Sequence, residues 1–165
     1  MKKSIVTVLA LIISIASFSQ EFGNLKFKLP SKFSKHMESN LTTNQGLTGS
    51  KNNVRFIFHE AAEPANKPDS SFRQQWQAIM ATATNNAPIP TPKRKTTLEG
   101  IKYFENGAKT VVDGEEEYSQ LLVFILDDTI QPVQIVVKDQ KTYKAESAEL
   151  ISEFLDSIKL LKKKK

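Results

Sequence analysis

The stretch Leu121 to Leu126 is apolar at every position, and a hairpin signal precedes it by a few residues. That signal is Asp113-Gly114, because the tight two-residue turn between antiparallel strands needs positive φ, which these residue types tolerate. A strand that alternates apolar and polar residues buries one face, whereas a strand that is apolar throughout needs cover on both faces. The chain is therefore expected to enclose this strand between two layers.

Two earlier segments alternate with period two and predict further strands. In residues 25–29, leucine and phenylalanine alternate with lysine, and Pro30 ends the pattern because proline has no N–H to donate to a ladder. Residues 54–58 place Val54 and two phenylalanines on one face. A short strand is also expected within residues 41–47.

The second half of the chain predicts additional antiparallel strands. Asn106-Gly107 predicts a bulge, with a second hairpin as the alternative. Asp127-Asp128 is expected to turn the chain into a strand that contains Pro132. Because proline cannot donate to a ladder, this strand is expected to begin at an edge or a bulge.

Two segments carry apolar residues at helical spacing. Asp69 is expected to cap the first helix, since its carboxylate can accept from free backbone N–H groups. The apolar stripes are Phe72, Trp76, Ile79, Met80 and Ala83 in the first helix and Leu150, Ile151, Phe154, Leu155 and Ile158 in the second. The predicted fold class is α+β: an α/β sandwich with one central antiparallel sheet flanked by helices.

The first 19 residues have the order of a secretory signal peptide, typical of bacterial exported proteins. Lys2 and Lys3 precede an apolar stretch, and small residues at positions 17 and 19 suit cleavage after Ser19. The apolar run is shorter than the roughly 18–20 residues that cross a bilayer, so no transmembrane segment is expected after cleavage. Residues 20–161 are expected to form a single domain, followed by a disordered basic tail at 162–165.

Positive charge is concentrated at the two ends of the chain. The sequence has 23 basic and 18 acidic residues; without two leader lysines and four tail lysines, 17 basic residues remain (23 − 6 = 17). A nucleic-acid-binding domain carries its excess positive charge on a face of the fold, so no nucleic-acid partner is expected. The chain has no cysteine, so an exported domain must be held by its core without disulfides.

Three features resemble the PsbP-like sandwich family. They are "FKLPSKFSK" at residues 27–35, the middle helix that carries Trp76, and "FLDSIKL" at residues 154–160. The family includes the extrinsic P subunit of photosystem II, a nuclear-import factor and small exported bacterial proteins. The resemblance covers roughly residues 24–161 and implies an α/β sandwich that serves as a non-catalytic binding or assembly module. It carries no shared active-site motif.

The sequence contains no pattern that indicates catalysis, a metal ion or a cofactor. His36 and His59 are the only histidines, and His59-Glu60 does not extend to the H-E-x-x-H pattern of zinc hydrolases. There is no G-x-S-x-G nucleophile elbow, no thiol and no phosphate-binding glycine loop. The acidic segment 113–117 lacks the spacing of a calcium loop and is interpreted as a solvated hairpin tip. The chain is therefore not expected to be an enzyme.

The densest basic cluster of the predicted domain is Lys93, Arg94 and Lys95, directly after three prolines at every second position. Such prolines favour an extended, exposed connector. The cluster is interpreted either as a stiff soluble loop or as a docking patch for an acidic partner. Trp76 is expected in the core, with a groove between helix and sheet as the alternative. These four residues are the candidate binding residues.

The expected function is that of a small, periplasmic or secreted binding or assembly module whose partner is a protein of the cell envelope. The alternative is a carrier or sensor of a small apolar ligand held between helix and sheet. In that case Phe72, Trp76 and Met80 would line a pocket. A carrier requires a continuous apolar cavity of roughly 300 Å³ or more, which a binding module does not need.

Overall fold

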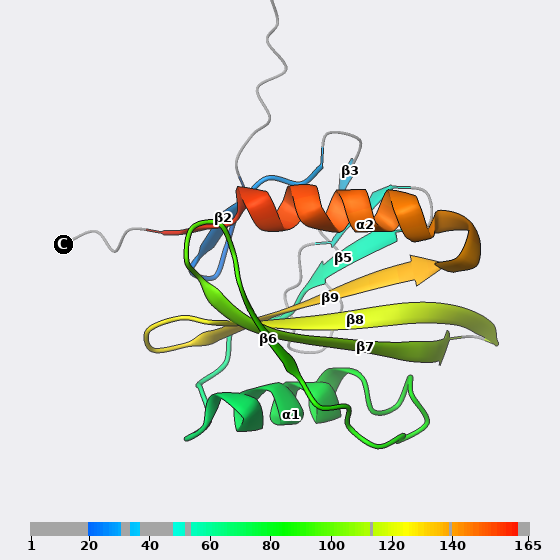
Figure 1. The fold of residues 1–165 in the computed structure, drawn as a ribbon, viewed down its shortest axis with the longest axis horizontal. Helices are drawn as coiled ribbons and strands as arrows, with labels where there is room; N and C mark the ends of the chain where they lie inside the picture. Colours follow the sequence, from blue (N-terminus) through cyan, green and yellow to red (C-terminus); the bar gives the residue numbers. More distant parts are fainter. Residues whose placement is uncertain are drawn as a thin grey trace, which may run out of the picture.

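The computed structural model describes residues 20–30, 34–36, 48–51, 54–112, 114–138 and 140–161 (Figure 1). The expected signal peptide, the strand expected within residues 41–47 and the basic tail lie outside these residues. The described part contains two antiparallel sheets and two helices. Neither helix of this part is long and apolar enough to cross a membrane.

The larger sheet is antiparallel throughout its described strands. In order across the sheet, these strands are β3 (Ser34–His36), β4 (Thr48–Lys51), β5 (Val54–Phe58), β9 (Ile130–Lys138), β8 (Glu115–Ile125), β7 (Lys102–Val112) and β6 (Lys93–Thr96). The hairpin predicted at Asp113-Gly114 is confirmed: Val112 of β7 lies opposite Glu115 of β8, and Gly114 has a φ of 82°.

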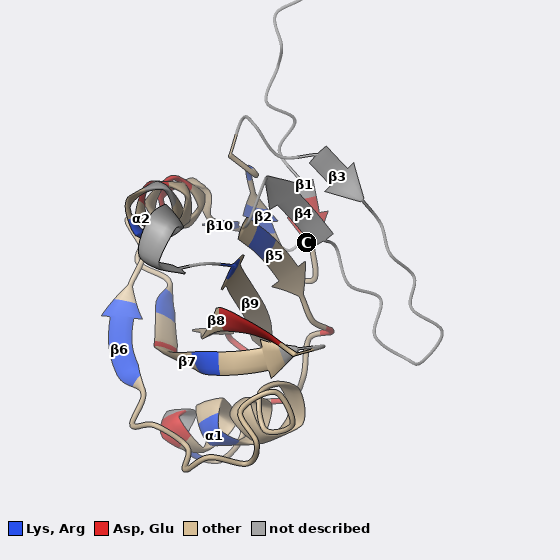
Figure 2. Cartoon of the chain, turned by 90° about the vertical axis from the view of Figure 1, so that its right-hand side faces the viewer, with Lys and Arg blue, Asp and Glu red and all other residues tan. Residues whose placement is uncertain are grey.

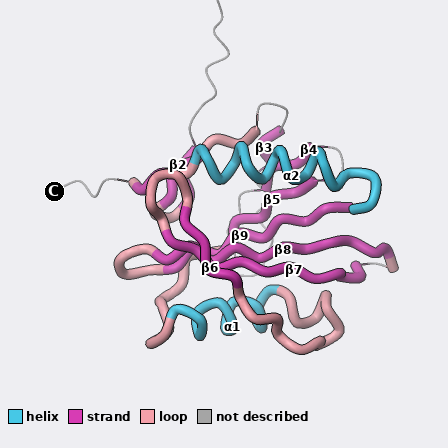
Figure 3. Tube along the Cα trace, viewed as in Figure 1, coloured by secondary structure: helices cyan, strands magenta, loops and turns pink. Residues whose placement is uncertain are grey.

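Helices α1 (Pro68–Ile79) and α2 (Gln140–Ser157) lie on opposite faces of the larger sheet (Figures 1 and 3). The prediction that Asp69 caps α1 is wrong, because Lys67 is the N-cap residue and its side chain makes no capping hydrogen bond. Pro68 instead occupies the first helical position, where its fixed φ suits the helix and its missing N–H would have had no helical partner.

Strand β8 contributes to both cores, as its apolar run predicted. Leu121 and Val123 belong to the hydrophobic cluster beneath α1. Leu122 and Phe124 belong to the cluster beneath α2. All four side chains have no exposed area, because successive residues of a strand point to opposite faces and each face is covered by a helix.

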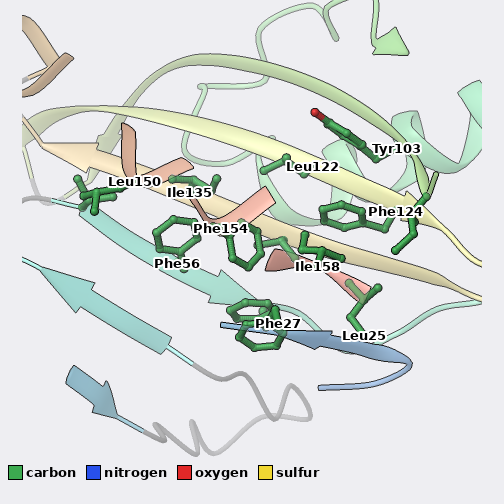
Figure 4. Packing of buried hydrophobic residues seen from close by; sticks show 14 of the residues in the cluster. Leu25, Phe27, Phe56, Tyr103, Leu122, Phe124, Ile135, Leu150, Phe154 and Ile158 are labelled. Carbon is green, nitrogen blue, oxygen red and sulfur yellow. The ribbon is translucent and has the colours of Figure 1, made fainter. Parts of the chain in front are cut away.

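The core beneath α2 is built from packed aromatic rings (Figure 4). The ring of Phe154 on α2 lies 4.8 Å from the ring of Phe56 on β5 and 5.8 Å from the ring of Phe27, measured between centroids. Tilted and edge-on arrangements at these distances are favourable for aromatic pairs. This cluster therefore joins α2 to strands from both sheets.

A second, smaller sheet consists of β1 (Gln20–Phe22), β2 (Leu25–Phe27) and β10 (Lys159–Leu160). Just beyond β10, the Leu161 N–H donates to the carbonyl of Asn24 at 3.0 Å. The sequence predicts one sheet, whereas the structure adds this second sheet, which joins the first and last described segments. A two-residue strand such as β10 has no periodicity to detect.

The bulge predicted at Asn106-Gly107 is wrong, because β7 and β8 pair without interruption and Gly107 lies directly opposite Gln120. A Cβ atom at Gly107 would lie 2.7 Å from Cζ of Tyr118 and 2.8 Å from the carbonyl oxygen of Ser119. The glycine is thus required because the tyrosine ring and the neighbouring backbone approach its Cα closely.

Strand β9 is central, so Pro132 does not mark an edge. The alternative of a bulge agrees with the pairing beside it: between the pairs Phe58–Val133 and Ala62–Ile130, three residues (59–61) lie opposite two (131–132). The last residue of β5 is Phe58, which lies opposite Val133, so Pro132 lies one step beyond the paired part of β5. The Pro132 carbonyl accepts from the His59 N–H at 3.1 Å. The side-chain amide of Gln131 donates to the His59 carbonyl, in place of the N–H that proline lacks.

Candidate functional site

The predicted basic cluster forms an edge strand of the larger sheet. Strand β6 contains Lys93, Arg94, Lys95 and Thr96, all four exposed, and it pairs only with β7 among the described strands. Figure 2 shows β6 as the outermost strand, drawn in blue because three of its four residues are cationic. The cluster is exposed as the sequence predicts, but it is a strand instead of a loop.

Two local features place β6 at this edge. The preceding connector is attached to β7, because the side-chain amide of Asn106 donates to the Thr91 carbonyl at 2.8 Å. After β6, the Gly100 N–H donates to the Thr97 carbonyl at 3.0 Å, which closes a tight turn into β7. Gly100 has a φ of 82°, which glycine adopts without steric cost. The chain thus reaches and leaves β6 through segments fixed to its one neighbour.

The three cations of β6 have different surroundings. Lys95 forms an ion pair with Glu105 on β7, and the Glu105 side chain also accepts from Nε2 of Gln120 at 3.0 Å. Glu105 is buried, and a buried carboxylate without a partner would cost free energy, so the positive charge of Lys95 offsets that cost. Burial, together with the smaller effect of the negative charge of Glu105, raises the pKa of Tyr103 to about 12, so this neighbouring phenol stays protonated.

Lys93 and Arg94 form no salt bridge with any other residue that the structure describes. Lys93 lies opposite Glu105 in the register, but the ion pair of that carboxylate is with Lys95. Arg94 lies opposite Phe104, an apolar residue. Strand β6 therefore presents two cations that the described fold leaves available to another molecule.

Trp76 lies in the core beneath α1 and is 1% exposed. Its ring centroid is 5.7 Å from that of Phe72, one turn earlier in α1. The indole Nε1 is buried without a hydrogen-bond partner among the described residues. The structure thus does not bring Trp76 and the exposed cations of β6 into one site, and a binding role for Trp76 stays a prediction.

A cleft of about 230 Å³ lies between α1 and the segment after β5. Its lining residues are His59, Glu60, Ala61, Ala62, Gln75, Ala78 and Ile79. Burial lowers the pKa of His59, whose Nε2 lies 3.3 Å from Oε1 of Gln134, so the imidazole is neutral at pH 7. The cleft is smaller than the roughly 300 Å³ at which ligand pockets begin. Phe72, Trp76 and Met80 do not line it.

Among the residues that the structure describes, no three His, Cys, Asp or Glu side chains are grouped so that they could hold a metal ion. His36 belongs to β3, which lies at the opposite end of the larger sheet from β6 in strand order.

The sequence identifies the cations of β6 but not their position at the end of a sheet. Strand order depends on pairing between distant segments, so no local pattern indicates it.

Comparison with known proteins gives matches only at the level of structure. No protein-family model and no curated protein sequence matches the chain. The solution structure of cyanobacterial PsbP (CyanoP) from Synechocystis sp. PCC 6803 matches with a TM-score of 0.57 and 12% identity, over 90% of this chain and 95% of that chain. LpqN, described as involved in cell envelope biogenesis of Mycobacterium tuberculosis, matches with a TM-score of 0.55 and 10% identity, over 84% of this chain and 83% of that chain.

The Ran-binding protein Mog1p of Saccharomyces cerevisiae also matches, with a TM-score of 0.50 and 14% identity, over 84% of this chain and 90% of that chain. The chain spans only 46% of a further matching structure, from Bacteroides thetaiotaomicron. At such low identities the likeness concerns the fold. It agrees with the resemblance that the sequence indicates.

Proposed function

We propose, from the PsbP-like fold that this chain adopts, that it is a small exported binding or assembly module without catalytic activity. Its site would be the basic edge strand β6, and its partner an acidic protein of the cell envelope. One observation carries the proposal: Lys93 and Arg94 are exposed at the end of the sheet and have no carboxylate partner among the described residues.

The charge of β6 contrasts with the balance of the domain around it. Without the leader and the tail, the chain has 17 basic and 18 acidic residues, so β6 is a local concentration of charge. Local charge complementarity determines which partners bind and how fast they associate more than it determines total affinity. This supports a specific acidic partner over general attraction to polyanions.

The proposed setting rests on the sequence and on the fold. The first 19 residues have the order of a secretory signal peptide, which supports a periplasmic or secreted location. Two proteins of similar fold agree with the proposal: Mog1p is described as a Ran-binding protein, and LpqN as involved in cell envelope biogenesis. Fold likeness alone is a weak warrant for function, so the site carries the argument.

The cleft beside His59 gives little support to the alternative of a carrier for an apolar ligand. Its volume of about 230 Å³ is below the usual range, and the side chains expected to line a carrier pocket belong to a packed core. Phe72 and Met80 have no exposed area. A binding module with an exposed edge accounts for these features without a cavity.

The test is capture of partners from a native envelope fraction by the immobilised protein and two variants. Lys93→Glu/Arg94→Glu reverses the free charges of β6. Arg73→Glu/Lys144→Glu makes the same change in net charge at exposed positions on α1 and α2. We expect a protein that the wild type and the helix variant capture, that the β6 variant does not, and that high salt releases. Identical captured proteins for all three would contradict the proposal.

A further inference from the structure

We infer that β6 binds its partner by strand addition: an extended acidic segment of another protein pairs with the open edge of the larger sheet. The inference rests on the proposed function and specifies how the site would work. In this mode, backbone hydrogen bonds supply affinity and side chains next to them supply selectivity. The argument depends on three properties of β6: which backbone groups point outward, whether they are free, and which charges flank them.

The turn after β6 determines which of its backbone groups point outward. The Thr97 N–H donates to the carbonyl of Ile101 at 2.9 Å, so this pair is hydrogen-bonded. Bonded and non-bonded pairs alternate along an antiparallel ladder. Counting back, Lys95 bonds with β7, whereas Thr96 and Arg94 occupy non-bonded positions. The N–H and C=O groups of Arg94 and Thr96 are therefore directed away from β7.

These outward groups lie at an open edge. Strand β6 is the last strand in the order of the larger sheet, and Figure 2 shows no other described segment beyond it. Within the described part of the chain, no hydrogen bond engages the backbone of Arg94 or Thr96 from that side. In the free protein water must satisfy these groups, since backbone donors and acceptors are rarely left unpaired. A bound strand would find two donors and two acceptors.

The side chains of β6 favour an acidic strand and oppose a second copy of β6. Exposed lysines on an edge strand are a common way to prevent edge-to-edge association, because a second copy would place like charges side by side. The same charges attract carboxylates at cross-strand positions. Arg94 and Lys93 point to opposite faces of the sheet because they are consecutive residues. The best partner therefore has two consecutive acidic residues in an extended segment.

The test uses a defined probe, an acetylated and amidated peptide of sequence Thr-Val-Glu-Glu-Val-Thr, with its binding followed by fluorescence anisotropy. Thr96→Pro removes one outward N–H and keeps every charge; proline is tolerated in an edge strand where its N–H would face solvent. Thr96→Ala is the matched control. We expect Thr96→Ala to bind as the wild type does and Thr96→Pro to bind about tenfold more weakly, since a lost hydrogen bond and a disturbed edge together cost about that factor.

Three further measurements test the binding mode and the charge of the occupant. Amide hydrogen exchange of the wild type should slow at Arg94 and Thr96 when the peptide binds, and change little at Lys95, whose N–H already bonds to β7. A peptide N-methylated at alternate residues has one edge without donors and should lose binding, as should a peptide with Lys-Lys in place of Glu-Glu. The N-methylated peptide also decides the matter if Thr96→Pro fails to fold.

The outcomes separate this inference from the proposed function. Binding that is lost in Lys93→Gln/Arg94→Gln but retained by Thr96→Pro and by the N-methylated peptide would overturn strand addition and leave an acidic partner in place. No binding of the acidic peptide, or equal binding of the lysine peptide, would overturn the acidic strand as occupant. A dimer of the wild type that Thr96→Pro dissociates would show that the occupant is a second copy of the chain.

Discussion

Trp76 has the largest fully buried side chain of the described core, and its indole Nε1 has no hydrogen-bond partner among the described residues. Its ring packs beneath α1 against Phe72 and strand residues such as Leu121. Burial of a large aromatic ring removes much apolar surface from water, whereas a buried N–H without a partner costs free energy. The position therefore stabilises the fold through the area of the ring, and the nitrogen reduces the net gain.

We expect Trp76→Ala to lower the free energy of unfolding by about 3–5 kcal/mol, because it removes a fully buried ring and leaves a cavity. Trp76→Phe should cost less, since it keeps an aromatic ring and deletes the unpaired N–H. Leu98→Ala is the control: Leu98 is 80% exposed, and its substitution should change stability by less than about 0.5 kcal/mol. Denaturant unfolding of the three variants measures these values. Unchanged stability of Trp76→Ala would indicate that the ring is not structural.

Individual residues also show where sequence patterns stop being informative. Asn106-Gly107 has the composition of a turn or bulge, yet Gly107 lies inside a regular strand because Tyr118 packs closely against it. Glu105 is buried despite its charge, because Lys95 and Gln120 on the neighbouring strands contact its carboxylate. Both environments arise from cross-strand neighbours, which the sequence around each residue does not contain.

At the scale of elements, sequence patterns predict the helices and the hairpin, which depend on neighbouring residues, but not the pairing of distant strands. Both helices follow from apolar stripes, and the β7–β8 hairpin follows from Asp113-Gly114. The pairing of β10 with β2 joins segments more than 130 residues apart, and no local pattern indicates it. The candidate site shows the same division: exposure of the cations was predicted, whereas the place of β6 at the sheet edge was not.

The structure predicts that β10 stabilises the domain although it has only two residues. It pairs Leu160 with Leu25, and the following Leu161 N–H donates to Asn24. A chain truncated after Leu161 should unfold like the full domain. A chain truncated after Ile158 should lose about 1–3 kcal/mol, from two or three backbone hydrogen bonds and some apolar contact. Chemical denaturation compares the two truncations, and equal midpoints and slopes would contradict a role for β10.

At the scale of the whole molecule, positive charge is concentrated in two separate basic elements, strand β6 and the C-terminal lysines. The apolar side chains of β8 are buried in the two cores and do not contribute to the surface. Strand β6 provides a compact basic edge at one end. The four C-terminal lysines, which lie outside the described residues, provide a second basic element of a different kind.

The two basic elements can be distinguished by deletion of Lys162–Lys165. For residues 20–165, this changes the net charge from +3 (21 basic minus 18 acidic residues) to −1. A lysine near an anionic membrane contributes about 1 kcal/mol, and salt screens that attraction. We therefore expect weak binding of the intact chain to anionic vesicles at physiological salt, and none after deletion. Co-sedimentation of both chains across a salt series measures this.

The same deletion should leave the affinity of β6 for the acidic peptide unchanged, because the pairing of β6 with β7 positions its cations. Vesicle binding that survives deletion but is lost in Lys93→Glu/Arg94→Glu would assign the membrane contact to β6 and count against a protein partner there. If deletion of the tail lowers the affinity for the acidic peptide, then attraction by overall charge, and not the geometry of the edge, selects the partner. Paired measurements on vesicles and peptide thus decide whether this module recognises a strand or only a negative surface.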